Sequence, residues 1–177
     1  QFNLPGLPVI GDRIGAGLGA PVTTTPVGFK HIVREIECGD VLVGGEERGG
    51  IWAPGYIPER DGVRVGLILA EVVAALSRPL HEEWSAITDE YGAWEYGRRD
   101  LAIPNADRKV IEANAKALRH VGGVPVARVD TTDGVKLLRE DGYWLMLRFS
   151  GTEPVLRLYA EGDSVEMCET LLGEADA

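Results

Sequence analysis

The sequence is poor in the residues that build metal centres and disulfide frameworks. It contains two cysteines, Cys38 and Cys168, and three histidines, His31, His81 and His120. Because the cysteines are far apart and lack CxxC spacing, we expect free thiols in a reducing compartment rather than a disulfide. The histidines share no metal-ligand spacing, so we assign no metal ligand to this chain.

Long apolar runs and an excess of positive charge are also missing. No segment approaches the length of a membrane-spanning helix and no signal peptide is recognisable, so we expect a cytoplasmic protein. The 18 lysines and arginines are outnumbered by 28 aspartates and glutamates, which gives a formal charge of −10. This balance argues against a nucleic acid or an anionic membrane as partner. An acidic chain that binds phosphate must therefore gather its cations locally.

What the sequence does contain is the run Arg-Phe-Ser-Gly-Thr-Glu-Pro at 148–154. Arg148 offers the two-pronged donor that phosphate oxygens accept. Ser150 and Thr152 add hydroxyl donors, and Gly151 lets backbone N–H groups come close. These groups suit an oxyanion, so the run predicts a phosphate-binding loop between two strands. The alternative is an ordinary polar hairpin turn, which the same residue types also favour.

A second glycine-rich run, Gly-Gly-Glu-Glu-Arg-Gly-Gly at 44–50, follows the apolar segment 41–43. Together the two runs resemble the α-D-phosphohexomutases, the phosphoglucomutase/phosphomannomutase family. That family has a sugar-binding loop of the form G-E-E-S-G in its third domain and a phosphate loop of the form R-x-S-G-T-E-P in its fourth. The segments Thr-Pro-Val-Gly-Phe-Lys at 25–30 and Ile-Pro-Glu-Arg-Asp-Gly at 57–62 also resemble the family, in the same order.

The resemblance implies roles for several further residues. Glu46 would accept hydrogen bonds from two sugar hydroxyls, and Gly28 and Lys30 match a segment that closes over the sugar. Arg157, in the strand after the phosphate loop, would support the phosphate site. The alternatives are a solvated loop acid for Glu46 and a solvated helix-surface cation for Lys30. Arg48 stands in the sugar loop where the family usually has serine; because a long cation cannot make the serine's contact, the sugar preference stays open.

Two domains are expected. Apolar spacing predicts helices at 9–18, near 28–36 and at 63–76, and the last is apolar on most sides and therefore expected to be buried. With a strand at 41–43, this order predicts an α/β domain with a mixed sheet over residues 1–103. The resemblance identifies it as similar to domain 3 of the family, N-terminally incomplete.

The boundary is expected beside Pro104, because a proline restricts the residue before it. Residues 104–177 predict a smaller α+β domain, similar to domain 4 of the family. We expect a hinge at 101–105, on which this domain would close over bound sugar. Its predicted elements are a helix that follows Asn105, an antiparallel sheet with strands at 124–129, 135–138, 143–147 and 155–160, and a final helix starting at 163.

The family's phosphoserine loop and its D-x-D-x-D-R-like magnesium loop have no counterpart in this sequence. We therefore expect a C-terminal piece that binds substrate but is inactive alone. For the intact enzyme, the resemblance implies an isomerase of carbohydrate metabolism that interconverts hexose 1-phosphate and hexose 6-phosphate, of glucose or mannose. A phosphoserine and a bisphosphate intermediate would transfer the phosphoryl group, with Mg²⁺ held by the protein's N-terminal domains. The alternatives are a stand-alone, non-catalytic sugar-phosphate-binding module and a phosphoglucosamine mutase.

Overall fold

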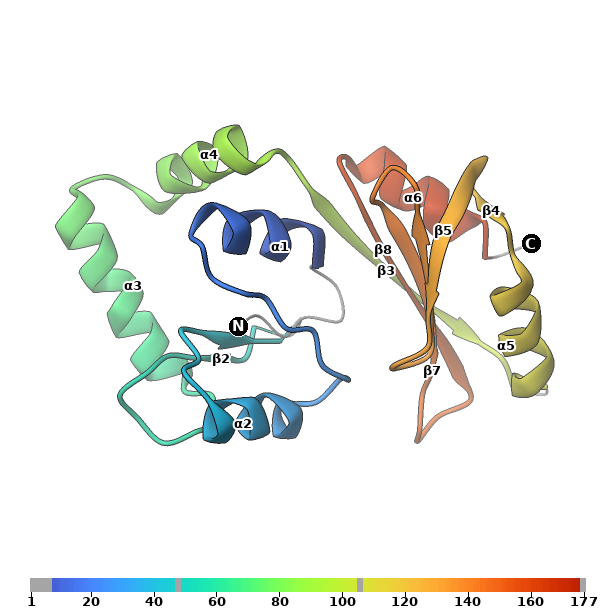
Figure 1. Ribbon diagram of the computed structural model, residues 1–177, viewed down its shortest axis with the longest axis horizontal. Helices are drawn as coiled ribbons and strands as arrows, with labels where there is room; N and C mark the ends of the chain where they lie inside the picture. Colours follow the sequence, from blue (N-terminus) through green and yellow to red (C-terminus); the bar gives the residue numbers. More distant parts are fainter. Residues whose placement is uncertain (1–7, 47–48, 105–106, 176–177) are drawn as a thin grey trace. The chain divides into compact units, whose positions relative to one another are not determined.

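The computed structural model describes residues 8–46, 49–104 and 107–175. The chain forms two compact units, residues 1–93 and 94–177. The first is drawn from blue to green and the second from yellow-green to red (Figure 1).

The break between the units falls earlier than the expected boundary at 103/104. Strand β3 (Glu95–Ala102) pairs antiparallel along its whole length with β8 (Val155–Gly162), so it belongs to the second unit. The Ile103 N–H also donates to the Pro154 carbonyl at 2.8 Å. These bonds hold residues 101–103, the first residues of the expected hinge, against the sheet of the second unit.

The first unit consists of helices and, in the described part of the chain, a short antiparallel ladder instead of the expected mixed sheet. The helices predicted at 9–18 and 28–36 are confirmed. The apolar segment 41–43, expected as a strand, instead lies just before β1, and Val41 packs into a core with Phe29, Ile32 and Trp52. The elements are α1 (Pro8–Gly17), α2 (Phe29–Cys38), β1 (Gly44–Gly45), β2 (Ile51–Trp52), α3 (Gly62–Leu76) and α4 (Leu80–Tyr91).

Helix α3 was predicted correctly as a helix but wrongly as buried. Asp61 caps its start, because its Oδ1 accepts from the N–H groups of Val63 and Arg64 at 2.9 and 3.0 Å. Ser77, with a left-handed φ of 56°, ends it. Val63 and Leu67 are nevertheless 78% and 68% exposed. The prediction of burial was wrong because an apolar composition does not specify whether another element covers the helix. No helix within the described residues is long and apolar enough to cross a membrane.

The second unit is an antiparallel sheet with two helices, as expected. Its strands lie in the order β3-β8-β7-β6-β5-β4, and the four strands predicted after residue 124 are confirmed. The remaining elements are β4 (His120–Val121), β5 (Val124–Asp130), β6 (Val135–Arg139), β7 (Trp144–Phe149), α5 (Arg108–Ala117) and α6 (Val165–Gly173) (Figure 1).

One face of this sheet forms the hydrophobic core of the second unit. Leu137 and Leu158 from the strands pack with Ala115 of α5 and Leu171 of α6, and all of them are buried. Since successive side chains alternate between the faces of a strand, the residues that neighbour these leucines lie on the opposite face. The core therefore determines which strand residues are available for a polar site.

Removing Leu137 should destabilise the second unit strongly. Leu137→Ala leaves a cavity in a fully buried position and should lower the free energy of unfolding by about 2–5 kcal/mol. Leu118→Ala, at a position that is 43% exposed, is the matched control and should change it by about 0.5 kcal/mol or less. Urea unfolding followed by circular dichroism measures both, and equal effects would contradict this assignment of the core.

The two thiols should differ sharply in reactivity. Both are free; Cys38 is exposed and Cys168 is buried, and burial raises the pKa of Cys168 to about 11. At about pH 8 only roughly one Cys168 thiol in a thousand would be ionised, and the thiolate is the reactive form. A disulfide reagent should therefore label Cys38 quickly and Cys168 only after denaturation. Fast labelling that persists in Cys38→Ser would refute the burial of Cys168.

Candidate functional site

The predicted phosphate loop, residues 150–154, joins β7 to β8 as a tight connection. The Ser150 N–H donates to the Val155 carbonyl at 2.9 Å, which closes the base of the loop. The Val155 N–H donates to the Glu153 carbonyl at 2.8 Å. Within the loop the Thr152 N–H donates to Ser150 Oγ at 3.4 Å. The sequence thus predicted both the loop and its place between two strands.

Two arginines face each other at the base of this loop. Arg148 of β7 and Arg157 of β8 are direct register partners, and they lie on the face opposite the leucine core, because Leu147 and Leu158 belong to that core. Like charges directly opposite each other in a sheet are unfavourable. The pair is therefore a local concentration of positive charge in an acidic chain, and it needs anionic neighbours.

Acidic side chains balance these arginines in the structure. Arg157 Nη2 lies 3.5 Å from Glu153 Oε2, and Arg157 Nε lies 3.9 Å from Asp100 Oδ2. Arg148 Nε donates to Asp133 Oδ1 at 3.0 Å. Burial by itself would lower the pKa of Arg148, but the hydrogen bond and charge of Asp133, with a contribution from Tyr159, raise that pKa above its ordinary value. Arg148 therefore stays a cation at every physiological pH.

The three small residues of the loop differ in how they are placed. Ser150 is only 1% exposed, and its Oγ already accepts a backbone hydrogen bond, so it helps to shape the loop. Gly151 and Thr152 are exposed. A methyl group added at Gly151 would meet no atom within 4 Å. Folding therefore does not require glycine at this position.

The residues implied for sugar binding come together in a groove of the first unit, with a volume of about 640 Å³. Gly28 lies at the N-terminal end of α2 with a φ of 123°, and Lys30 follows it on the exposed side of that helix. Glu46 comes directly after β1, where its N–H donates to the Gly50 carbonyl at 2.9 Å. The groove is lined by Gly28, Phe29, Lys30, Val33, Arg34, Glu37, Glu46, Glu59 and Arg60.

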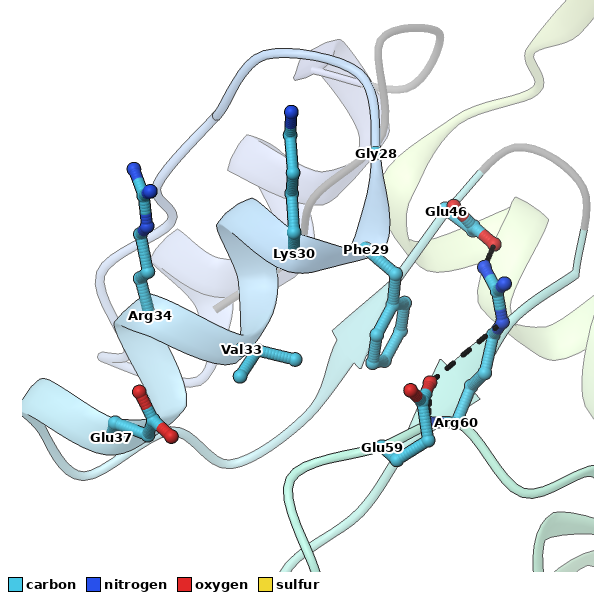
Figure 2. Close-up of a pocket in the computed structure, with 9 residues that line it drawn as sticks. All are labelled: Gly28, Phe29, Lys30, Val33, Arg34, Glu37, Glu46, Glu59 and Arg60. Carbon is cyan, nitrogen blue, oxygen red and sulfur yellow. Dashed lines mark hydrogen bonds and ion pairs between the residues drawn. The ribbon is translucent and has the colours of Figure 1, made fainter.

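Arg60 is a charged groove residue that the sequence alone did not single out. Its guanidinium pairs with Glu46, lies 5.3 Å from the centre of the Phe29 ring and has its Nε 3.8 Å from Glu59 Oε1. Figure 2 shows Glu46 and Arg60 turned toward each other. A side chain at Gly50 would collide with this pair, since its Cβ would lie 2.5 Å from Glu46 Oε1. The available signal was the 57–62 segment, which contains Arg60.

The structure thus forms two separate clusters. Gly28, Lys30 and Glu46 line the groove of the first unit, whereas Arg148, Arg157 and the 150–154 loop lie in the second.

Arg48, also predicted for the sugar site, lies outside the described residues. Asp133, which contacts Arg148, was missed because it lies between the strands predicted at 124–129 and 135–138, in no recognised motif. Within the described ranges no group of three or more His, Cys, Asp or Glu could hold a metal ion.

Comparison with known proteins identifies the chain. Residues 10–91 match the model of phosphoglucomutase/phosphomannomutase α/β/α domain III, and residues 101–176 match that of the phosphoglucomutase/phosphomannomutase C-terminal domain. A phosphoglucomutase/phosphomannomutase of Thermococcus kodakarensis is 32% identical over 161 residues, covering 91% of this chain and 33% of its own length. A phosphoglucosamine mutase of Acidothermus cellulolyticus is 32% identical over 163 residues, covering 88% of this chain and 30% of its own length.

A solved structure agrees with these sequence relatives. The putative phosphomannomutase of Thermus thermophilus superposes with a TM-score of 0.76 at 36% identity, over 99% of this chain and 35% of its own. The present chain thus spans about a third of the length of these relatives. The chain belongs to the phosphoglucomutase/phosphomannomutase family, of which it comprises the third and the C-terminal domain.

Proposed function

We propose that this chain provides the sugar-binding and phosphate-binding parts of a phosphohexomutase that interconverts hexose 1-phosphate and hexose 6-phosphate. The whole protein would act on glucose or mannose phosphates through a phosphoserine enzyme and a bisphosphate intermediate. The observation that supports this most directly is the facing pair Arg148 and Arg157 at the base of the 150–154 loop. A phosphate dianion placed beside the pair would offset its repulsion and accept its hydrogen bonds.

The phosphate cluster would hold the phosphate that is not reacting. Arg148 would supply charge-assisted donors, the Gly151 backbone and the Thr152 hydroxyl would add further donors, and Arg157 would supply a second positive charge. Binding energy from these contacts to the non-reacting phosphate would orient the sugar for phosphoryl transfer at its other end. Such a site requires only a phosphate, so it would accept either isomer of the substrate.

The groove of the first unit would recognise the sugar. The Glu46 carboxylate can accept hydrogen bonds from two neighbouring hydroxyls, and Lys30 would lie over the bound sugar from α2. In the structure Glu46 is paired with Arg60, which keeps the carboxylate in place beside Phe29. We place Arg48 in the same site on the strength of the family motif alone.

The bond-making groups would come from other parts of the protein. We propose that the phosphoserine and the Mg²⁺ ligands lie in its remaining domains, because the described residues of this chain contain no group of acids or histidines that fits a metal ion. This chain's residues would therefore bind and orient the substrate, and we derive no chemical step from them. A cytoplasmic location is part of the same proposal.

An amino sugar is the second candidate substrate. The Acidothermus relative, which is about as similar to this chain as the Thermococcus one, is named a phosphoglucosamine mutase. Arg48 would disfavour a positively charged amino sugar by like-charge repulsion if it lies close to the substrate. The affinity ranking of glucose, mannose and glucosamine 6-phosphates separates the two candidates.

Arg148→Ala should weaken phosphate binding by roughly tenfold or more, because a charge-assisted hydrogen bond contributes about 1.5–3 kcal/mol. Calorimetric titration of the chain with inorganic phosphate and with the three sugar phosphates measures this loss. Arg119→Ala, an exposed arginine of the same unit, is the matched control and should bind like the unchanged chain. Equal affinities for the two variants would refute the phosphate site.

Gly151→Ala should separate binding from folding. The open space around Gly151 means that the melting temperature should stay within about 2 °C. Phosphate affinity should fall severalfold, since the methyl group would stand between the backbone amide and the anion. Gly173→Ala, a second glycine with open space, should change neither quantity much. Unchanged phosphate affinity in Gly151→Ala would exclude its amide from the site.

A further inference from the structure

The turn between β5 and β6 is built directly against β7, the strand that contains Arg148. Asp130 shapes the turn, because its Oδ1 accepts from the Thr132 N–H at 2.9 Å and from the Thr132 hydroxyl at 2.7 Å. Gly134 has a φ of 85°, and a side chain there would collide with the Leu147 carbonyl oxygen. The backbone of this turn therefore approaches β7 as closely as only a glycine allows.

Asp133 projects from this turn onto the phosphate-site arginine. Its Oδ1 accepts the hydrogen bond of Arg148 Nε at 3.0 Å, and the side chains of Asp133 and Arg148 are 25% and 22% exposed. The Nε–H lies on one edge of the guanidinium, and the terminal amino groups lie at its far end. Asp133 engages Nε, and the Tyr159 side chain also interacts with Arg148; the remaining terminal N–H groups are the donors that can bind an anion.

We propose that Asp133 is a positioning residue for the phosphate site: it fixes Arg148 so that the terminal amino groups, and not Nε, bind the phosphate. The inference rests on the proposed function, in which Arg148 is the phosphate-binding arginine. A long side chain that is already ordered loses less conformational entropy when the ligand binds. The turn that holds Asp133 is separate from the 150–154 loop, so two different hairpins would build one site.

A simpler role for Asp133 predicts the opposite result. If Asp133 only neutralised the charge of Arg148, it would compete with the phosphate, and its removal would tighten phosphate binding. If Asp133 positions Arg148, its removal weakens binding even though a negative charge has been taken away. The sign of the change in affinity therefore distinguishes the two roles.

Three variants of the chain, titrated with inorganic phosphate and with glucose 6-phosphate at fixed salt, test the proposal. Asp133→Ala removes the acceptor and should bind roughly tenfold more weakly. Asp133→Asn keeps an oxygen for Arg148 Nε without the charge, and should bind within about fivefold of the unchanged chain or more tightly. Arg148→Ala gives the phosphate affinity that remains when the arginine is absent. Circular dichroism verifies the fold of each variant.

The outcomes are distinct. Affinity of Asp133→Ala equal to or above that of the unchanged chain, with Arg148→Ala impaired, overturns the positioning role alone. Affinity of Asp133→Asn as low as that of Asp133→Ala also overturns it, because the charge and not the hydrogen bond would then matter. Unchanged affinity in Arg148→Ala overturns the proposed function itself.

A measurement on the unchanged chain covers the case in which Asp133→Ala does not fold. Nitrogen-resolved NMR of the arginine side chains distinguishes Nε from the terminal amino groups. Phosphate should shift and slow the exchange of the terminal N–H signals of Arg148 and leave its Nε–H signal nearly in place. A shift confined to Nε–H would overturn the proposal.

Discussion

The register between β7 and β8 is the constraint on which the proposed phosphate site depends. It sets Arg148 directly opposite Arg157, and the alternation of side chains directs both arginines away from the leucine core. A slip of β7 by one residue would move Arg148 to the apolar face, away from Arg157 and at a large desolvation cost. The packing of Leu147, Leu156 and Leu158 therefore stabilises the unit and also determines where its cations lie.

Acidic residues make this placement of like charges tolerable. The chain has a net charge of −10, yet the site needs a positive potential, and the structure meets both conditions with local pairs. Asp133 contacts Arg148, while Asp100 and Glu153 flank Arg157. The groove of the first unit uses the same arrangement with the charges exchanged, since there Glu46, the acid proposed to bind the sugar, is paired with the cation Arg60. In both clusters a residue from a different segment holds the functional side chain.

Much of the fold followed from local patterns. The helices α1, α2 and α3 and the strands β5 to β8 were predicted because apolar periodicity, caps and turns are local properties. Strand β3 was missed, because its charged residues Arg98, Arg99 and Asp100 are typical of an edge strand rather than of a buried one. Its membership of the sheet moved the domain boundary from 103 to 93.

The sequence by itself determined the family, the two loops proposed to bind ligands and the residue types within them, because these are encoded in contiguous motifs of a few residues. Only the tertiary structure decided which side chains hold the functional ones. Asp133 reaches Arg148 from another hairpin, and Arg60 reaches Glu46 across 14 positions of the chain. It also decided burial, as the exposed Val63 and the buried Ser150 show. Contacts between distant segments depend on register and packing, which no local motif specifies.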